Sequence, residues 1–410
     1  MARAIDGDPA LRAYAVVASL LHALTGLAWF TYKHIDTLVT GDDCVCWPLV
    51  PHCEGVRALL TPDFVRGAVV LYMALGVVAA ALFARRRPPL GLATFMAATV
   101  LCGALYALDY RLRLNQTYMF GWVALALLVA PRKAQALQAL VALFYFWAGT
   151  LKVNREWISG AALYEKPLLV PAALVPAACV YVLVLEMVLI WGLFAPSPRW
   201  RWAVYVQLLV FHAVSWKVVG YFYPLLMFGL TAIYPLVWLR APDEALTLAC
   251  LRTDRGARTA VGAVAAVFSA FQLVPHLFPG DTAVTGEGRL FSLHMFDARV
   301  ECSGGATIRT ASGAAAHADL INERTDARTR CDPIVLVAEA GRLCRALDGK
   351  SDHPRLDVAI DAKRTTDERA TPLIHVDDFC RQNIAYSMWH HNDWIGPLSS
   401  ADQRAGPGRP

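Results

Sequence analysis

Ionisable side chains lie within long apolar runs of this sequence. Lys152 ends one such run, Glu186 lies deep in another, and His212 lies in the middle of a third. A charge is costly inside a lipid bilayer, so each of these residues is a candidate functional residue. A lysine that is shielded from water can lose its proton and act as a base, whereas an interfacial lysine extends its amine into water. Both roles are open for Lys152.

Polar and aromatic residues close to these positions allow two interpretations. Trp147 and Trp157 flank Lys152 and are either the walls of a pocket or anchors at a membrane interface. Asn115 and Gln116 open another apolar run and form either a helix cap or a polar patch beside a buried site. We treat all four as candidate substrate-binding or cofactor-binding residues.

The two remaining ionisable residues need partners if they are buried. A lone carboxylate at Glu186 must be neutral or paired, with a lysine or histidine on a neighbouring helix as its expected partner. His212 is either a structural hydrogen-bonding residue or part of a site. Lys217 lies five residues later, near the end of the run, and is typical of an interfacial lysine.

Seven of the ten cysteines fall in two segments between or beyond the apolar runs. They are Cys44, Cys46 and Cys53 in the first segment and Cys302, Cys331, Cys344 and Cys380 in the second. Disulfides persist in oxidising compartments, so these cysteines predict disulfides that join the first segment to the second. An odd number leaves one cysteine outside these disulfides. Zinc held by Cys44, Cys46, His52 and Cys53 is the weaker alternative, because the usual two-residue gap is missing; we expect no metal.

The composition describes a membrane protein with a charge-rich C-terminal part. The chain has 410 residues, of which 57% are hydrophobic and 17% are charged. A soluble domain is about one quarter charged, so the composition argues against an entirely soluble chain, and it excludes disordered chains, collagen-like chains and small disulfide scaffolds. About half of the charged residues lie in the last third of the chain, a share typical of a soluble domain. No basic stripe favours nucleic-acid binding.

The apolar runs predict an α-helical polytopic membrane protein with about eight or nine spans. Nine candidates are found, of which the fourth is short and the seventh and eighth meet near Gly220. The runs cover 14–32, 65–84, 89–109, 117–131, 134–152, 170–194, 203–220, 221–239 and 259–278. The first is expected to be a retained span, because it lacks the small-residue cleavage site of a signal peptide.

Basic residues predict the orientation of these spans. With the N-terminus in the cytoplasm, most basic residues between the runs face the cytoplasm, as the positive-inside rule requires. These residues are Arg85, Arg86, Arg87, Arg132, Lys133, Arg199, Arg201, Arg240, Arg252, Arg255 and Arg258. Nine spans then place residues 281–410 and the seven cysteines named above outside the cytoplasm.

The C-terminal part reads as an extracytoplasmic mixed α/β domain. We expect a transmembrane domain over 1–280, an α/β domain over 281–398 and a disordered tail over 399–410. The expected elements are a strand or short amphipathic segment at 289–296, a hairpin turning at Gly304 and Gly305, a helix over 332–347 followed by Gly349, and a strand over 355–364.

The residues around Lys152 resemble a known family. The segment YFWAGTLKVNREWISG (145–160) is similar to the signature of vitamin K-dependent γ-glutamyl carboxylases and the related horizontally transferred transmembrane (HTTM) domain proteins. The matching positions are Ala148, Gly149, Lys152, Trp157 and Gly160. The similarity is collinear over about 30–385 and includes Cys46-Trp47-Pro48-Leu49, Asn115-Gln116-Thr117-Tyr118, Phe211-His212 and the segments RLFSLHMF, AGRLCRAL and PRLDVAID.

This resemblance implies a membrane enzyme. Its base would be Lys152, deprotonating a vitamin K-type hydroquinone or another reduced quinone, so that CO2 and O2 are used to carboxylate glutamate in an exported peptide or protein. A quinone reductase and the lipid bilayer are the other implied partners. Gln116 replaces the family's histidine, which removes any role for a titrating imidazole there. The resemblance also suggests a Cys46–Cys344 disulfide.

Two other functions remain open. Some relatives with this transmembrane domain resemble non-catalytic factors for the maturation or export of secreted peptides. A proton-coupled transporter would instead use Glu186, His212 and Lys217 as a proton path. No inverted repeat supports the transporter, although such repeats are often cryptic.

Overall fold

The computed structural model divides the chain into two compact units. The first comprises Met1–Thr40 and Gly55–Ala270, and the second comprises Gly41–Glu54 and Phe271–Pro410. The short segment Gly41–Glu54 therefore belongs with residues that follow it by more than two hundred positions. The structure describes residues 2–42, 44–50, 53–163, 166–294, 300–321, 329–348, 354–382 and 384–396.

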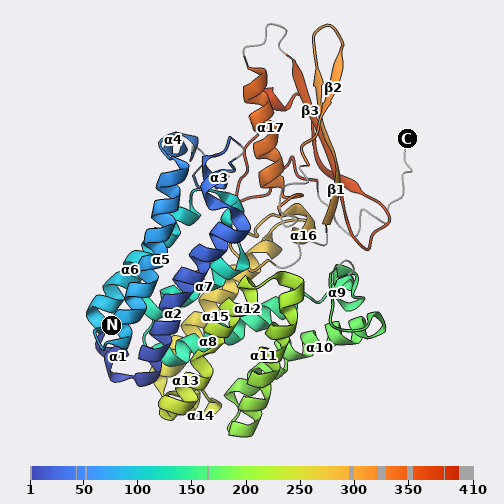
Figure 1. Cartoon of the computed structure of the whole chain (residues 1–410). Helices are drawn as coiled ribbons and strands as arrows, with labels where there is room; N and C mark the ends of the chain where they lie inside the picture. Colours follow the sequence, from blue (N-terminus) through green and yellow to red (C-terminus); the bar gives the residue numbers. More distant parts are fainter. Residues whose placement is uncertain are drawn as a thin grey trace. The chain divides into compact units, whose positions relative to one another are not determined.

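The first unit is helical, and Figure 1 traces its helices from blue to yellow. The α-helices of the chain before residue 280 are α1 (Ala2–Gly7), α2 (Pro9–Ala28), α3 (Ile35–Thr40), α4 (Cys53–Arg57), α5 (Pro62–Ala84), α6 (Pro88–Tyr106), α7 (Asn115–Val129), α8 (Lys133–Thr150), α9 (Arg155–Ile158), α10 (Val175–Met187), α11 (Pro198–Val219), α12 (Phe222–Thr231), α13 (Ile233–Arg240), α14 (Leu248–Thr253) and α15 (Arg255–Leu273). Each of the nine predicted apolar runs coincides with helical structure.

Seven helical segments of the described chain are long and apolar enough to cross a membrane. They are Pro9–Lys33, Pro62–Ala84, Pro88–Tyr106, Ala172–Phe194, Pro198–Val219, Phe222–Arg240 and Arg255–Leu277. The runs at α7 and α8 are not among them. Helix α7 has only 15 residues, fewer than the roughly 20 that a span needs, and α8 carries the polar residues Gln135 and Gln138.

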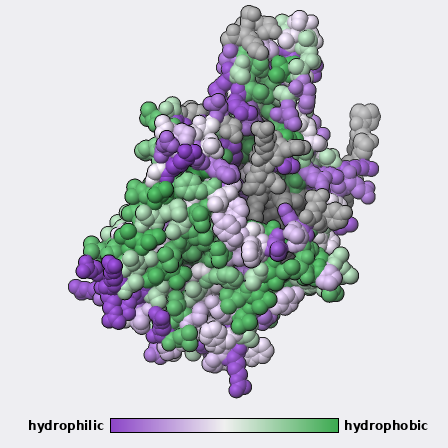
Figure 2. All heavy atoms as spheres, viewed as in Figure 1, coloured by the Kyte–Doolittle hydropathy of each residue, from purple (hydrophilic) through white to green (hydrophobic). Residues whose placement is uncertain are grey.

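The surface of the helical unit carries many large apolar side chains. Figure 2 shows hydrophobic residues spread over this unit. Several of them are more than half exposed, namely Leu71, Val77, Val100, Val129 and Val206. Water-soluble monomers rarely expose contiguous apolar surface of this extent, so the surface favours a lipid environment.

Helix α8 is the buried centre of the first unit. Every residue from Lys133 to Tyr145 is buried, as expected of a helix surrounded by others. Gln138 is accommodated because its amide is fully paired: Nε2 donates to the carbonyl oxygens of Ala134 and Glu244, and Oε1 accepts from the Leu246 N–H. The buried position of α8 allows it to hold polar side chains away from lipid and water.

The second unit contains a four-stranded antiparallel sheet and a helix. The strands are β1 (Val300–Arg309), β2 (Ala315–Ala318), β3 (Arg355–Arg364) and β4 (Thr371–Val376), in the order β2-β1-β3-β4. Among the described residues, the α-helices that lie wholly in this unit are the short α16 (Thr282–Thr285) and the longer α17 (Pro333–Leu347). Alternate residues of β3 are buried, and they share a core with the buried face of α17. The predicted helix at 332–347 and the predicted strand at 355–364 are confirmed.

The predicted hairpin at Gly304 and Gly305 is wrong. One strand, β1, passes straight through both glycines and pairs with β3 along its whole length. The glycines mark a close approach of neighbouring backbone rather than a turn, because a Cβ on Gly304 would lie 2.1 Å from the Ala359 carbonyl oxygen. The expected element at 289–296 is turn and irregular structure as far as His294, and its last two residues lie outside the described ranges.

Three disulfides are present, and none joins the first cysteine segment to the second. They are Cys46–Cys53, Cys302–Cys331 and Cys344–Cys380. The suggested Cys46–Cys344 bridge and the predicted links between the two segments are therefore wrong. Each bridge joins cysteines of the same segment, at sequence separations of 7, 29 and 36 residues. Cys44 is the seventh cysteine, outside these disulfides.

Asp357 on β3 gives the second unit a testable pH dependence. Its carboxylate accepts hydrogen bonds from the Asp378 N–H (2.9 Å) and from Arg309 Nε (2.8 Å). These bonds hold the pKa of Asp357 below its ordinary value. The stabilisation they provide is complete above the pKa of the unfolded chain, about 3.9, and is lost as the pH falls through the lower folded pKa.

We therefore expect Asp357→Asn to lower the stability of the sheet at pH 7 and to flatten its decline in acid. Hydrogen exchange of the β1 and β3 amides between pH 7 and pH 3 measures both effects, after correction for the intrinsic exchange rate. Glu368→Gln changes an exposed carboxylate and serves as the control. Equal acid sensitivity in Asp357→Asn and the unsubstituted protein would contradict the prediction.

Candidate functional site

Lys152 lies in a turn between two helices of the first unit. Helix α8 ends at Thr150, and the Lys152 N–H donates to the Gly149 carbonyl oxygen at 2.9 Å. Asn154 then caps the short helix α9, with its side-chain oxygen accepting from the Trp157 N–H at 2.9 Å. This sequence of helix end, turn and capped helix folds the chain back and holds Trp157 beside Lys152.

Lys152 forms a buried ion pair with Glu186 on α10. Its Nζ donates to Glu186 Oε2, and the side chains are only 3% and 0% exposed. The ammonium also lies 5.4 Å from the centre of the Trp157 ring, whose Nε1 donates to the Cys179 carbonyl oxygen at 2.9 Å. Lys152 is therefore buried under an aromatic ring and does not extend to the surface.

Gly149 is the reason that the two helices approach closely at this level. A Cβ at this position would lie 2.6 Å from Met187 Cγ and 3.2 Å from Glu186 Cβ. Helices α8 and α10 can thus be close only because residue 149 has no side chain. The Ala-Gly step before the lysine positions the lysine against its carboxylate partner.

We expect Gly149→Ala to lower the stability by about 1–3 kcal/mol, because the added methyl group forces α8 and α10 apart. Thermal unfolding in detergent measures the effect. Gly149→Ala combined with Met187→Ala should recover part of the loss, since the nearest clashing atom is removed. Gly121→Ala on α7 is the matched control, because a Cβ there meets nothing within 4 Å. An equal response of both glycine positions would disprove the close-packing argument.

A second buried polar pair lies two helical turns from Lys152. The Tyr145 hydroxyl and His212 Nε2 are 2.6 Å apart, and His212 on α11 is completely buried. Tyr145, Gly149 and Lys152 are spaced at i, i+4 and i+7, so they follow one face of the chain as α8 ends. One face of α8 therefore carries a line of polar contacts to α10 and α11.

Two atoms of this line are buried without a hydrogen-bond partner among the described residues. They are Glu186 Oε1 and His212 Nδ1. An unpaired buried polar atom costs about 1–3 kcal/mol. Glu186 Oε1 can accept a further hydrogen bond, and His212 Nδ1 can accept or donate one according to its tautomer.

The other predicted site residues lie in different surroundings. Trp147 Nε1 donates to Ser269 Oγ on α15 at 3.0 Å. Asn115 and Gln116 open α7 and are both buried, and Gln116 Oε1 has no partner among the described residues. The next residues of α7, Thr117 and Tyr118, line a cavity of about 320 Å³ whose lining does not include Lys152 or Glu186. Lys217 is exposed.

Two buried residues were missed from the sequence. His22 on α2 is 1% exposed, and its ring nitrogens lie 3.1 Å from the Tyr72 hydroxyl and 3.4 Å from Thr99 Oγ1. It also lines the 320 Å³ cavity. Tyr145 was missed as the partner of His212. The available signals were a histidine inside the first apolar run and a tyrosine seven residues before Lys152.

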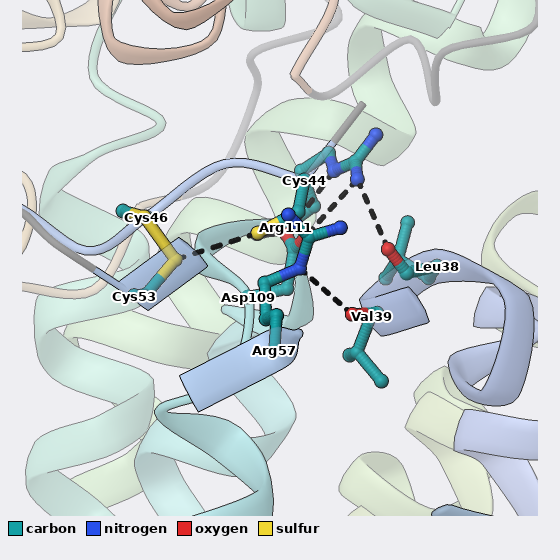
Figure 3. Close-up of a disulfide and its surroundings, with 8 residues drawn as sticks. All are labelled: Leu38, Val39, Cys44, Cys46, Cys53, Arg57, Asp109 and Arg111. Atoms are coloured by element: carbon teal, nitrogen blue, oxygen red, sulfur yellow. Dashed lines mark hydrogen bonds and ion pairs between the residues drawn. A yellow bond between two sulfur atoms is a disulfide. The ribbon is translucent and has the colours of Figure 1, made fainter. Parts of the chain in front are cut away.

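A disulfide occupies two of the cysteines of the weaker zinc alternative. The sulfur atoms of Cys44, Cys46 and Cys53 lie within 4.8 Å of one another, but Cys46 and Cys53 are bonded to each other. Disulfide sulfurs do not act as thiolate ligands, so this arrangement does not suit zinc. His52, the fourth suggested ligand, lies outside the described residues. Figure 3 shows the three cysteines.

The Lys152–Glu186 pair can exchange a proton internally. A lysine–glutamate ion pair and the corresponding neutral amine and carboxylic acid have the same net charge, zero, and differ in how strongly their surroundings stabilise the separated charges. The pair as a whole can therefore accept one proton from a bound hydroxyl group and carry one positive charge.

Comparison of this chain with protein-family models, with curated protein sequences and with solved structures found no match.

Proposed function

We propose that the chain is an integral membrane protein with γ-glutamyl carboxylase-like chemistry, in which Lys152 is the base. The observation that carries this proposal is the Lys152–Glu186 pair, buried under Trp157, in which Glu186 Oε1 has no hydrogen-bond partner among the residues that the structure describes. A lysine at a membrane interface is solvated by water and needs no buried carboxylate. A lysine that acts as a base must be neutral before it accepts a proton, and Glu186 can hold the proton that Lys152 gives up.

Membrane insertion is supported by the apolar helices and by their exposed aliphatic side chains. The proposed orientation has the N-terminus in the cytoplasm and the C-terminal unit outside, as the charge bias predicts. An odd number of spans places the two ends of the chain on opposite sides of the membrane, so seven spans and nine spans give the same orientation. The three disulfides support an oxidising compartment for the second unit.

Two features of the site support a reduced quinone as the proposed cofactor. Lys152 Nζ and the atoms Glu186 Oε1 and His212 Nδ1, which have no partner among the described residues, would hydrogen-bond its hydroxyl groups, and the Trp157 ring would give an apolar wall. A reduced quinone held there would supply, with O2, the strong base needed to remove a γ-proton from glutamate. Lys152 would take the quinol proton, Glu186 would share it, and Trp157 would help to exclude water.

The proposed substrate is glutamate in an exported peptide or protein, with CO2 as the second substrate and a quinone reductase as the partner that regenerates the quinol. The test is the incorporation of labelled CO2 into glutamate-containing peptides by purified protein with vitamin K hydroquinone or with other quinols. We expect Lys152→Ala and Glu186→Gln to lose incorporation, with a reduction of at least a hundredfold for a lost general base.

The matched control is Lys217→Ala, which removes an exposed lysine from the neighbouring helix α11 and should leave incorporation unchanged. Equal activity in Lys152→Ala and the unsubstituted protein would reject the role of Lys152. Absence of incorporation with every quinol tested would reject the carboxylase proposal itself.

A proton path is the second candidate function, favoured by the line of polar contacts along α8. Glu186 and His212 are both buried, and each has an atom without a partner in the described part of the chain, so protons could pass between them through water. Proton-coupled uptake in proteoliposomes, abolished by Glu186→Gln, would favour this function over carboxylation. A non-catalytic export factor would show neither activity and would crosslink to exported peptides without changing their mass.

A further inference from the structure

A cluster of three cysteines in the second unit combines a disulfide with a neighbouring thiol. Cys46 and Cys53 are bonded, with 5.5 Å between their Cα atoms, and Cys44 Sγ lies 3.5 Å from Cys53 Sγ. Figure 3 shows Cys53 between the other two sulfurs, bonded to one and in contact with the other. Three cysteines can form one disulfide among themselves, so this cluster always retains one thiol.

The distance between Cys44 and Cys53 is that of reacting groups before a bond forms. Near-attack geometries place reacting atoms about 3–3.5 Å apart. Cys44 and Cys46 are separated by one residue, so either can be close to Cys53 with little movement of the chain. The Cys46–Cys53 bridge spans seven residues in sequence, and a Cys44–Cys53 bridge would span nine. The entropic cost of closing the loop is therefore similar for the two bridges.

Exposure distinguishes the three sulfurs. Cys53 is only 3% exposed, whereas Cys44 and Cys46 are half-buried. A thiol or disulfide of another molecule can therefore reach Cys44 or Cys46, while Cys53 is shielded. Cys53 is therefore the shielded sulfur, bonded to Cys46 and in contact with Cys44.

We propose that Cys44, Cys46 and Cys53 form a thiol–disulfide exchange site that rearranges disulfides in cysteine-containing proteins. The thiolate of Cys44 attacks Cys53 Sγ, the Cys46–Cys53 bond breaks, and Cys46 leaves as a thiolate. The Cys46 thiolate then attacks a disulfide of the substrate protein, forming a mixed disulfide and releasing a substrate thiolate. Another substrate thiolate attacks the mixed disulfide and restores the enzyme thiolate. The number of disulfides is unchanged, so no oxidant or reductant is consumed.

The internal exchange is tested on the full-length protein by mass spectrometry. After incubation at pH 8, acid quenching and alkylation, we expect the label on both Cys44 and Cys46, with Cys53 in a disulfide in each species. Cys46→Ser should form a Cys44–Cys53 disulfide. Alkylation of Cys44 alone in the unsubstituted protein, alkylation of both Cys44 and Cys53 in Cys46→Ser, or protection of all three sulfurs by zinc would overturn the proposal.

The action on other proteins is tested with scrambled ribonuclease A as the probe substrate. We expect reactivation to be faster with the unsubstituted protein than in buffer, and slower by on the order of tenfold in both Cys44→Ser and Cys46→Ser. Cys250→Ser removes a half-buried cysteine of the first unit and should leave the rate unchanged. A rate equal to that in buffer, or a Cys44→Ser rate equal to that of the unsubstituted protein, would overturn the proposed activity.

Discussion

Replacing Glu186 with leucine is expected to lower the free energy of unfolding by about 3–5 kcal/mol, because Lys152 is then left as an unpaired buried charge. The two side chains are almost completely buried, so water cannot take the place of the carboxylate. Replacing both members, as Lys152→Met with Glu186→Leu, should recover most of this loss, since apolar side chains of similar size can fill the same space. Thermal unfolding in detergent, arranged as a double-mutant cycle, measures the coupling between the two sites.

Lys217→Met is the control for this cycle, because it removes an exposed lysine and should change the stability little. If the effects of Lys152→Met and Glu186→Leu simply add, the two side chains are not paired in the folded protein. The doubly substituted protein also separates stability from chemistry. It should fold and yet fail to incorporate labelled CO2 if the proposed function is correct.

The second large effect is expected in the sheet, where Gly304→Ala should destabilise the second unit by about 3–5 kcal/mol. Gly304 has a φ of +113°, which disfavours residues with a side chain, and an added Cβ would lie 2.1 Å from the Ala359 carbonyl oxygen. That oxygen belongs to the backbone of β3, so relief requires the two central strands to separate. Hydrogen exchange of the β1 and β3 amides in the full-length chain measures the loss.

Gly313→Ala separates the two causes of this effect. Gly313 also has a positive φ, +83°, but a Cβ there meets nothing within 4 Å. Its replacement should therefore cost only the backbone conformational penalty, about 1 kcal/mol. If both substitutions have the same small effect, the strands can separate without cost and the steric argument fails.

The helices could be predicted from the sequence because their signal is local. An apolar run of about 20 residues predicts a helix from its length and composition alone, as at Pro62–Ala84 and Pro198–Val219. Strand β3 was predicted for the same reason, since its alternating pattern is contained in one segment. Strands β2 and β4 were not predicted, because they are short and one residue of β4 is proline.

The candidate site residues were named one by one from the sequence, but the contacts between them were not predicted. Lys152 and Glu186 were each unusual in an apolar run, and a lysine or histidine was expected as the partner of Glu186. Which one pairs with it depends on how α8 and α10 approach, which is set by Gly149 and is not visible in either run alone. The pairing of the cysteines was not predicted either, because it depends on distances in three dimensions that the sequence does not contain.

The assignment of Gly41–Glu54 to the second unit has a consequence for synthesis. The ribosome completes this segment early, but its structural partners, which begin at Phe271, follow only after the whole stretch Gly55–Ala270. At roughly 5–20 residues per second, the delay is about 10–40 s. During this time the bond between Cys46 and Cys53 needs only residues that are already made, so it can shape the segment while the nascent chain is still growing. The order of translation therefore gives the cysteine cluster a period in which it exists without the rest of its unit.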